Sequence, residues 1–294
     1  MRTVISLVVA LLASLFGTVL LWYGGGHAVF ELGRFAAEGA GFFPLLVALG
    51  CLLLAGAAVT VRWSRAGVIA AGAVHVLFSL LGILVPFQPM DGISSPTTQL
   101  LGMLFDVDPA LATGGYYFVA FGAGLLIGFA LLGVGILARR GHPTVLARVL
   151  SAVGGLLALG ACGWAFAAGG DFYRRTFQML DWDAVTAVTL VVAALIFGAL
   201  IALSGRSAIG SWIAGGVLSL VGVILLVADP VAYAGLGSEV LIILPVLGWS
   251  GAILAVGMTV LGLALGITLR VAASAGAERH TASDLTQDAA PGAV

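Results

Sequence analysis

The sequence predicts an all-α fold, a polytopic bundle of eight membrane-spanning helices. Three features support this: long uncharged stretches, a low overall charge and an uneven placement of arginine. Eight long stretches contain no Lys, Arg, Asp or Glu. Each is longer than the ~20 apolar residues that a helix needs to cross ~30 Å of hydrocarbon. The stretches are residues 3–26, 39–61, 66–90, 109–138, 149–170, 184–205, 207–228 and 240–269.

The composition excludes an ordinary soluble protein. The chain is 61% hydrophobic and 9% charged, whereas a soluble domain has about 25% charged residues and its helices keep a charged face toward water. Its 43 glycines suit membrane helices, in which small residues let backbones approach closely. The net charge of -1 predicts no nucleic-acid partner, and we expect a lipid bilayer around the chain.

The positions of the arginines predict the orientation of the chain. If the eight stretches cross the membrane in turn, nine of the twelve basic residues fall on one side. Short loops rich in Arg stay in the cytoplasm. We therefore expect a multi-pass protein of the plasma membrane with cytoplasmic N- and C-termini. The nine residues are Arg2, Arg62, Arg65, Arg139, Arg140, Arg148, Arg206, Arg270 and Arg279.

The order of stretches and loops indicates an internal duplication. Residues 1–140 form a first four-helix membrane unit and residues 141–270 a second. An even number of crossings makes both units enter the membrane from the same side, so the repeat is parallel. Residues 271–294 show no apolar periodicity, and we expect a disordered cytoplasmic tail.

Residue matches between the halves support the same interpretation. Laying Ser79 on Ser219 aligns the third stretch with the seventh, and laying Gly128 on Gly257 aligns the fourth with the eighth. Gly128 and Gly257 lie closer together in the sequence than Ser79 and Ser219 do. The first half therefore has more residues between its third and fourth stretches, which predicts a longer external loop there.

A charged external segment follows the first stretch of each half. At 100° per residue, residues 29–38 and 173–181 each place apolar side chains opposite charged ones, which predicts a helix lying in the membrane interface. In the second half, Tyr173, Phe177 and Leu180 share the apolar face. They either form an external surface for a partner or anchor the rim of the bundle.

The two long external loops differ in what they contain. In the first half, the acidic loop of residues 87–113 includes a short helix that starts at Pro96 and runs through Phe105. In the second half, Ser238 opens an apolar run that we expect Pro245 to break. That run is long enough for a short half-helix followed by a full crossing.

His75 is the one ionisable side chain deep inside a predicted span. Ala71, His75 and Ser79 recur every four residues, a small-residue face typical of helix contacts, and Ser219 is the match of Ser79. The candidate interior polar site is therefore His75, Ser79 and Ser219. His75 either acts as a proton relay or solute ligand, or is a neutral imidazole bonded to a neighbouring helix.

The acidic pair of the first external loop allows several interpretations. Asp106 and Asp108 could hold a divalent cation, or resemble the acidic motif in the outer loop of lipid-linked glycosyltransferases, or form a solvated loop. Two carboxylates supply too few oxygens for calcium, which takes six to eight. We predict no cofactor and no metal, because the sequence contains no zinc, nucleotide or nucleophile motif.

Two glycine pairs predict close helix crossings. Gly124 and Gly128 lie four residues apart in the fourth stretch, and Gly262 and Gly266 do so in the eighth. Such pairs let helix backbones touch, either inside a bundle or between protomers. They make a membrane-protein partner or a homo-oligomer possible.

Two classes of function fit these features. One is a non-enzymatic membrane scaffold or accessory subunit, and the other is a small-solute permease with a pathway between the two halves. The few polar groups inside the predicted spans favour the scaffold, since transporter sites are built from polar groups and broken helices at mid-membrane. An enzyme acting on lipid ranks third, and we expect no enzymatic activity.

Overall fold

The computed structural model describes residues 2–33, 41–84, 96–138, 143–179, 181–228 and 238–288. Within these ranges all regular structure is helical, as the sequence predicts. The long helices are α1 (Arg2–Gly33), α2 (Phe43–Val59), α3 (Arg65–Leu84), α4 (Pro96–Val107), α5 (Pro109–Ala120), α6 (Ala123–Leu137), α7 (Val145–Tyr173), α8 (Ala184–Ala202), α9 (Ile209–Val227), α10 (Ser238–Trp249) and α11 (Ala252–Asp288). Three short helical segments complete them: η2 (Thr60–Arg62), η3 (Arg174–Gln178) and η4 (Leu203–Gly205).

Seven of the described helices are long and apolar enough to cross a membrane: α1, α2, α3, α7, α8, α9 and α11. An eighth span results if the bent pair α5 and α6, which meet at 57°, is taken as one crossing. Large apolar side chains such as Leu52, Leu77 and Leu156 stand exposed on the outer faces of these helices. Lipid tolerates such a surface and water does not, so the chain is a helical multi-pass membrane protein.

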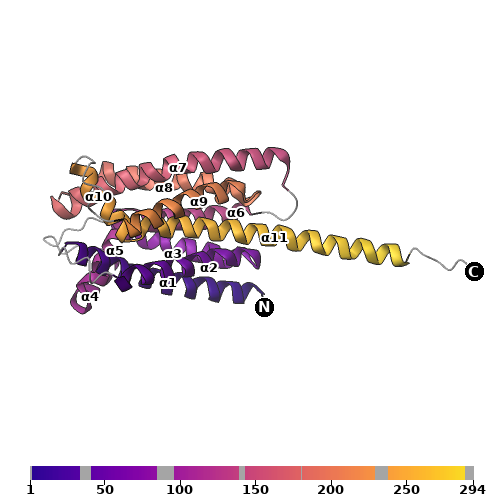
Figure 1. Ribbon diagram of the computed structural model, residues 1–294, viewed down its shortest axis with the longest axis horizontal. Helices are drawn as coiled ribbons and strands as arrows, with labels where there is room; N and C mark the ends of the chain where they lie inside the picture. The colour runs from indigo at the N-terminus through magenta and orange to yellow at the C-terminus, as the bar shows by residue number, and fades with distance from the viewer. Residues whose placement is uncertain are drawn as a thin grey trace, which may run out of the picture.

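The helices run roughly side by side along one long axis (Figure 1). The N-terminus and the projecting end of α11 lie at one end of the bundle, and α4, α5 and α10 lie at the other. α1 packs against α2, α3 and α5, while α7 packs against α8 and α9. The most extensive contacts between the halves are those of α2 with α11 and of α6 with α8.

At the end of the bundle that carries the N-terminus, two serines close the turns between spans. Ser6 donates from its hydroxyl to the carbonyl of Ser64, at 3.2 Å, and Ser151 donates to the carbonyl of Ser207, at 2.6 Å. The accepting carbonyls follow the last turn of a helix, where backbone oxygens lack an intrahelical partner. These hydrogen bonds fasten the start of α1 and of α7 to the next two helices of each half.

A glycine turn interrupts the helical run in both halves. α5 and α10 contain 12 residues each, and each is followed by a glycine with positive φ, Gly122 at 73° and Gly251 at 71°. A half-helix followed by a full crossing is therefore present in the second half, as expected. The expectation that Pro245 makes the break was wrong, because Pro245 lies inside α10. A proline keeps a helical φ near -65°, whereas this turn needs the left-handed conformation that glycine adopts at little cost.

The external segments differ from the interfacial helices that we expected. Residues 29–33 continue α1 without a break, and Tyr173 ends α7 and leads directly into the π-helical turn η3. No proline or left-handed glycine separates these residues from the spans, so the helices simply extend outward. Residues 34–40 lie outside the described ranges. The short helix expected within residues 87–113 is confirmed as α4, which starts at Pro96.

The segment after residue 270 also differs from the expectation of disorder. α11 continues as helix to Asp288, so residues 271–288 carry regular structure. This stretch contains many Ala residues together with Glu and Arg, which have high helix propensity, and no Pro or Gly after Gly276. A helix that has already formed in the span needs no new nucleus to extend.

Candidate functional site at His75

His75 lies on the buried face of α3, with only 5% of its surface exposed. Its Nε2 lies 2.8 Å from the hydroxyl oxygen of Ser14 on α1. Ser14 in turn accepts, through its backbone carbonyl, a 2.8 Å hydrogen bond from the hydroxyl of Thr18. The imidazole is therefore hydrogen-bonded to a neighbouring helix.

The His75–Ser14 pair faces a cavity of about 470 Å³ in the first half of the chain. Four helices contribute to its wall: α1, α3, α4 and α5. The lining residues are Leu11, Ser14, Leu15, Thr18, Val19, Trp22, Val74, His75, Phe78, Leu100, Leu104, Leu111 and Phe118. Ser14, Thr18, Trp22 and His75 are the polar members of this set, and none of the lining side chains is charged.

Aromatic rings form one side of the cavity. Trp22 stacks on Phe78 with ring centroids 5.4 Å apart and meets Phe118 edge-on at 6.0 Å. The ring of His75 lies 5.8 Å from that of Phe118. Trp22 is buried, and its Nε1 has no hydrogen-bond partner within the part of the chain that the structure describes. An indole N–H that is buried in this way calls for an acceptor.

The structure places the three candidate polar residues in different surroundings. Only His75 lines the cavity. Ser79, one turn further along α3, lies against Gly124 of α6, and Ser219 of α9 lies against Gly257 of α11. No single site therefore unites the three side chains.

Sequence analysis missed Ser14, Thr18 and Trp22. These residues are spaced by four along the first apolar stretch and therefore share one face of α1. That spacing was the available signal, because two hydroxyls and an indole in register on a membrane helix mark an inward face.

Two backbone contacts, one in each half, are alike. A Cβ added to Gly72 would lie 2.8 Å from the carbonyl oxygen of Gly128. A Cβ added to Gly215 would lie 3.1 Å from the carbonyl oxygen of Gly257. These contacts agree with the sequence alignment of Gly128 with Gly257 on α6 and α11. On α3 and α9, however, they align Gly72 with Gly215, whereas the sequence alignment paired Gly72 with Trp212.

If Gly72 is aligned with Gly215, His75 is aligned with a different residue of α9 than in the sequence alignment. Leu218, also buried, takes the place of His75 on α9. Ser219, which the sequence match put on Ser79, corresponds instead to Val76, since both contact the glycine of the neighbouring helix. The polar pair at the cavity therefore has no equivalent in the described second half.

A second polar cluster lies at the outer end of α1. His27 Nε2 is 3.1 Å from Oδ2 of Asp108, and Oδ1 of Asp108 accepts hydrogen bonds from the backbone N–H groups of Ala110 and Leu111. Partial burial favours the neutral carboxyl, but the hydrogen bonds from His27 and the backbone outweigh it, so the pKa of Asp108 lies below its usual value. Asp108 is thus the N-cap of α5, and the arrangement assigns it a structural contact rather than a free carboxylate.

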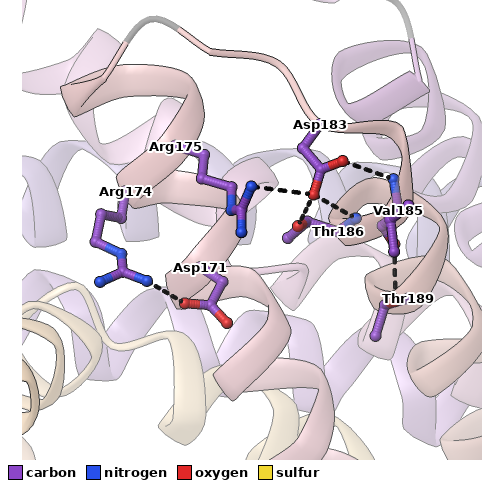
Figure 2. Close-up of polar contacts among 7 residues, drawn as sticks. All are labelled: Asp171, Arg174, Arg175, Asp183, Val185, Thr186 and Thr189. Carbon is purple, nitrogen blue, oxygen red and sulfur yellow. Dashed lines mark hydrogen bonds and ion pairs between the residues drawn. The ribbon is translucent and has the colours of Figure 1, made fainter.

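Asp183 is likewise the N-cap of α8 (Figure 2). Its carboxylate accepts hydrogen bonds from the N–H groups of Val185 and Thr186 and from the hydroxyl of Thr186. The Thr186 hydroxyl and the Val185 N–H lower the pKa of Asp183, and the charge of Arg175 adds to the effect.

Two ion pairs lie at the end of α7, and one of them, Arg175 with Asp183, joins η3 to the N-cap of α8 (Figure 2). Arg174 lies 3.0 Å from Asp171, and Arg175 lies 3.5 Å from Asp183. All four side chains are partly exposed, and pairs of this kind contribute only about 0–1 kcal/mol. They orient the turn η3 more than they stabilise it.

The predicted external partner surface lies close to this turn. Tyr173 packs toward the bundle, with ring centroids 5.4 Å from both Tyr117 and Phe121. Leu180 and the side chain of Phe177 lie outside what the structure describes. The use of this face by a partner stays a prediction.

Within the described ranges no three His, Cys, Asp or Glu side chains are grouped so as to hold a metal ion. No family model matches the chain, and no curated protein and no solved structure is similar to it. The functional argument therefore depends on the geometry alone.

Proposed function

We propose that the protein is a non-enzymatic membrane scaffold or accessory subunit. In this proposal it has eight crossings, two parallel four-helix units and both termini in the cytoplasm. Three matched features of the halves support the proposed repeat: the 12-residue half-helices α5 and α10, the glycine turns at Gly122 and Gly251, and the serine bonds that close the inner turns. The turns that carry Arg62, Arg65 and Arg206 lie at the same end of the bundle as the N-terminus.

A reciprocal contact across the halves also supports the repeat. Gly25 of α1 packs against the backbone of Ser250, at the turn between α10 and α11. Gly169 of α7 packs against the backbone of Phe121, at the turn between α5 and α6. The first helix of each half thus packs against the glycine turn of the other half, as expected for two units related by an axis along the membrane normal.

The observation that carries the scaffold proposal is the closed contact between the halves. A Cβ added to Gly133 of α6 would lie 2.8 Å from the carbonyl oxygen of Gly198 of α8. Gly262 of α11 is packed even more tightly on the carbonyl of Ala55 of α2. Backbones in direct contact leave no room for a solute route along these seams, and the cavity at His75 lies inside the first half.

Purification from native membranes tests the scaffold. We expect a stoichiometric membrane-protein partner that is lost when Phe177 and Leu180 are replaced by Ser. Val107→Ser is the matched control, because Val107 is an exposed apolar residue at the outer end of α4. A protein that remains alone and fully folded after mild extraction and chemical cross-linking contradicts the proposal.

A permease is the second candidate, because both halves contain a broken helix. Transporter sites commonly lie at such breaks, here Gly122 and Gly251. Uptake of a small solute by proteoliposomes, abolished by Gly122→Ala with the fold intact, would establish this alternative. Under the scaffold proposal, liposomes with and without the protein take up solutes equally.

The proposed orientation has its own test. A cysteine at position 206 should react with a membrane-impermeant maleimide only after the cells are opened, whereas a cysteine at position 171 should react in intact cells. Both native cysteines, Cys51 and Cys162, are buried and give little background. The reverse labelling pattern overturns the orientation.

A further inference from the structure

We propose that the cavity at His75 binds a neutral, membrane-soluble alcohol, whose hydroxyl group bonds His75 and Ser14 and whose apolar body fills the rest of the cavity. This inference is independent of the proposed scaffold role. It depends on where the cavity opens, on the hydrogen bonds that its polar side chains can still make, and on the apolar character of the remaining wall.

The cavity wall reaches the outer surface of the bundle. Leu15, Val19, Val74 and Leu100 line the cavity, and each has between 41% and 60% of its surface exposed. In a membrane-spanning bundle this surface faces lipid, so a molecule dissolved in the bilayer reaches the cavity without crossing water.

One nitrogen of His75 faces the cavity. Nε2 is bonded to the Ser14 hydroxyl, and no described residue bonds Nδ1. Nor does Nδ1 belong to the fully enclosed polar atoms that lack a partner, which include Nε1 of Trp22. The indole N–H is therefore sealed off, whereas Nδ1 meets open space, and the open space that His75 lines is the cavity.

His75 and Ser14 together have one hydrogen-bond donor and one acceptor to spare. No charged side chain lines the cavity, so the imidazole is neutral and carries one N–H. If the Ser14 hydroxyl donates to Nε2, the N–H lies at Nδ1 and is free to donate, while Ser14 Oγ can still accept. If Nε2–H donates to Ser14 instead, Nδ1 is free to accept and the Ser14 hydroxyl is free to donate. Thr18 donates to the Ser14 carbonyl and keeps its lone pairs, which adds an acceptor.

A hydroxyl group matches this spare pair, because it donates one hydrogen bond and accepts another. A carbonyl or an ether oxygen can only accept, and an ammonium group can only donate. An ion would in addition give up its hydration without gaining a charged partner. The polar side chains thus favour a neutral alcohol over these other groups.

The depth of the pair restricts the ligand further. His75 lies ten residues from the start of α3 and nine from its end, roughly 15 and 14 Å at 1.5 Å per residue. A phospholipid headgroup at that depth would lose its water, whereas a single hydroxyl would keep both of its hydrogen bonds.

The rest of the cavity suits an apolar body. Its volume of about 470 Å³ lies within the range of ~300–1,000 Å³ that is typical of small-molecule pockets, and its wall is almost entirely aliphatic and aromatic. The ring of Phe118 lies 5.8 Å from that of His75, so an aromatic face borders the polar pair. An alkyl chain or an aromatic ring can therefore carry the hydroxyl, and a fatty alcohol and an alkylphenol represent these two sources.

Photo-crosslinking in phosphatidylcholine nanodiscs tests the site. The probe is a long-chain alcohol with a diazirine in its chain, and the labelled peptides are mapped by mass spectrometry. We expect saturable labelling of α1, α3 and α4. Hexadecanol should compete about five- to tenfold better than its methyl ether, the size of one hydrogen bond. The stronger competitor of hexadecanol and an alkylphenol of equal length identifies the source, and equal competition means that the site recognises the hydroxyl alone.

Two pairs of variants make the test specific. His75→Leu should bring hexadecanol and its methyl ether to within about twofold of each other while labelling stays saturable. Ser79→Ala, on the same helix but against Gly124 and outside the cavity, should keep the difference. Val74→Trp fills the cavity mouth and should lower saturable labelling by about tenfold or more, whereas Leu77→Trp, exposed on α3 outside the cavity, should leave it unchanged.

Three results would overturn the proposal. Equal competition by hexadecanol and its methyl ether in the unaltered protein means that the hydroxyl is not recognised. Labelling that grows linearly with probe concentration means that ordinary lipid chains fill the cavity. Cross-linking of position 74 to a co-purified protein means that a partner helix occupies it. Thermal unfolding of each variant shows whether a change in labelling arises from a lost fold.

Discussion

In the proposed repeat, His75 and Leu218 hold corresponding places in the two halves of the molecule, and their surroundings differ in polarity but share a helix contact. Both lie on a helix whose preceding glycine, Gly72 or Gly215, contacts the backbone of the last span of its half. Beside His75 the structure has a hydrogen bond and a cavity. Leu218 is simply buried. The backbone contacts are shared, and the polar site belongs to one half.

The first helices of the two halves, α1 and α7, also share their packing contacts but differ in polar side chains. Ser6 and Ser151 make similar bonds at the end of the bundle that carries the N-terminus, and Gly25 and Gly169 make similar contacts nearer the other end. Between them α1 carries Ser14 and Thr18, whereas residues 158–163 of α7 contain no hydroxyl side chain. Positions where backbones touch tolerate only glycine or another small residue, so they stay alike. Positions around a cavity are free to differ, and there the first half carries polar groups.

The largest expected effect tests the shared packing. Gly25→Val and Gly169→Val should each destabilise the protein by about 3 kcal/mol or more, because the added carbons meet backbone atoms that cannot rotate away. An added Cβ would lie 2.5 Å from the carbonyl oxygen of Ser250 in one case and 2.6 Å from Cα of Phe121 in the other. Equilibrium unfolding in mixed micelles measures the loss.

Gly160 provides the control for both variants. A Cβ at Gly160 of α7 meets no atom of the described chain within 4 Å, so Gly160→Val should change the free energy of unfolding by less than about 1 kcal/mol. A strong effect of Gly25→Val without one of Gly169→Val would show that the two halves do not pack alike.

The second prediction exchanges the two residues that differ. Leu218→His should cost about 2 kcal/mol, because it buries a polar ring among apolar side chains without a partner. His75→Leu should cost less than about 1 kcal/mol, since the Ser14 hydroxyl can turn to a carbonyl of its own helix, as Thr18 does. Thermal unfolding of both variants in the same detergent makes the comparison, and equal costs would mean that α9 offers a polar partner after all.

The glycine turns give a third, smaller effect that should be the same in both halves. Gly122→Ala and Gly251→Ala place a side chain at positive φ, which costs about 1–2 kcal/mol. The nearest atoms are the ends of the Leu190 and Val47 side chains, which can shift. Both variants should therefore fold with lowered midpoints in thermal unfolding. A difference larger than about 1 kcal/mol between them would argue against equivalent turns.

Much of the architecture could be predicted from the sequence, since a membrane imposes length and polarity on every crossing. The absence of charge from residues 3–26 and 184–205 locates spans directly, and Pro96 marks the start of α4. The sequence could not show that the chain bends at Gly251 rather than at Pro245, because a glycine in an apolar run can be either a packing site or a bend. The chain has 43 glycines, and the structure is needed to tell those two uses apart.

The candidate site was only partly predictable. His75 stood out because an ionisable group is rare at that depth. Its partner Ser14 did not, because a serine on a membrane helix most often bonds its own backbone. The cavity itself depends on how α4 lies against α3, where Thr97 donates to the carbonyl of Phe78 at 2.8 Å. That contact joins a loop helix to a span and leaves no pattern in the sequence.

The smallest predicted effect concerns the N-caps, which mark different helices in the two halves. Asp108 caps α5 in the first half and Asp183 caps α8 in the second. The pKa of each lies below its usual value. A carboxylate with a lowered folded-state pKa stabilises the fold fully at pH values above its unfolded-state pKa of about 3.9. That stability is lost as the pH falls through the folded-state pKa.

Asp108→Asn should therefore remove part of the pH dependence without removing the cap, because Asn caps helices as well as Asp does. We expect the difference in thermal midpoint between pH 7 and pH 3 to shrink in Asp108→Asn and, separately, in Asp183→Asn. Asp171→Asn, which removes only an exposed ion pair, should change it least. If Asp108→Asn and Asp171→Asn behave alike, the hydrogen bonds from His27 and the α5 backbone contribute no more to folding than a surface ion pair does.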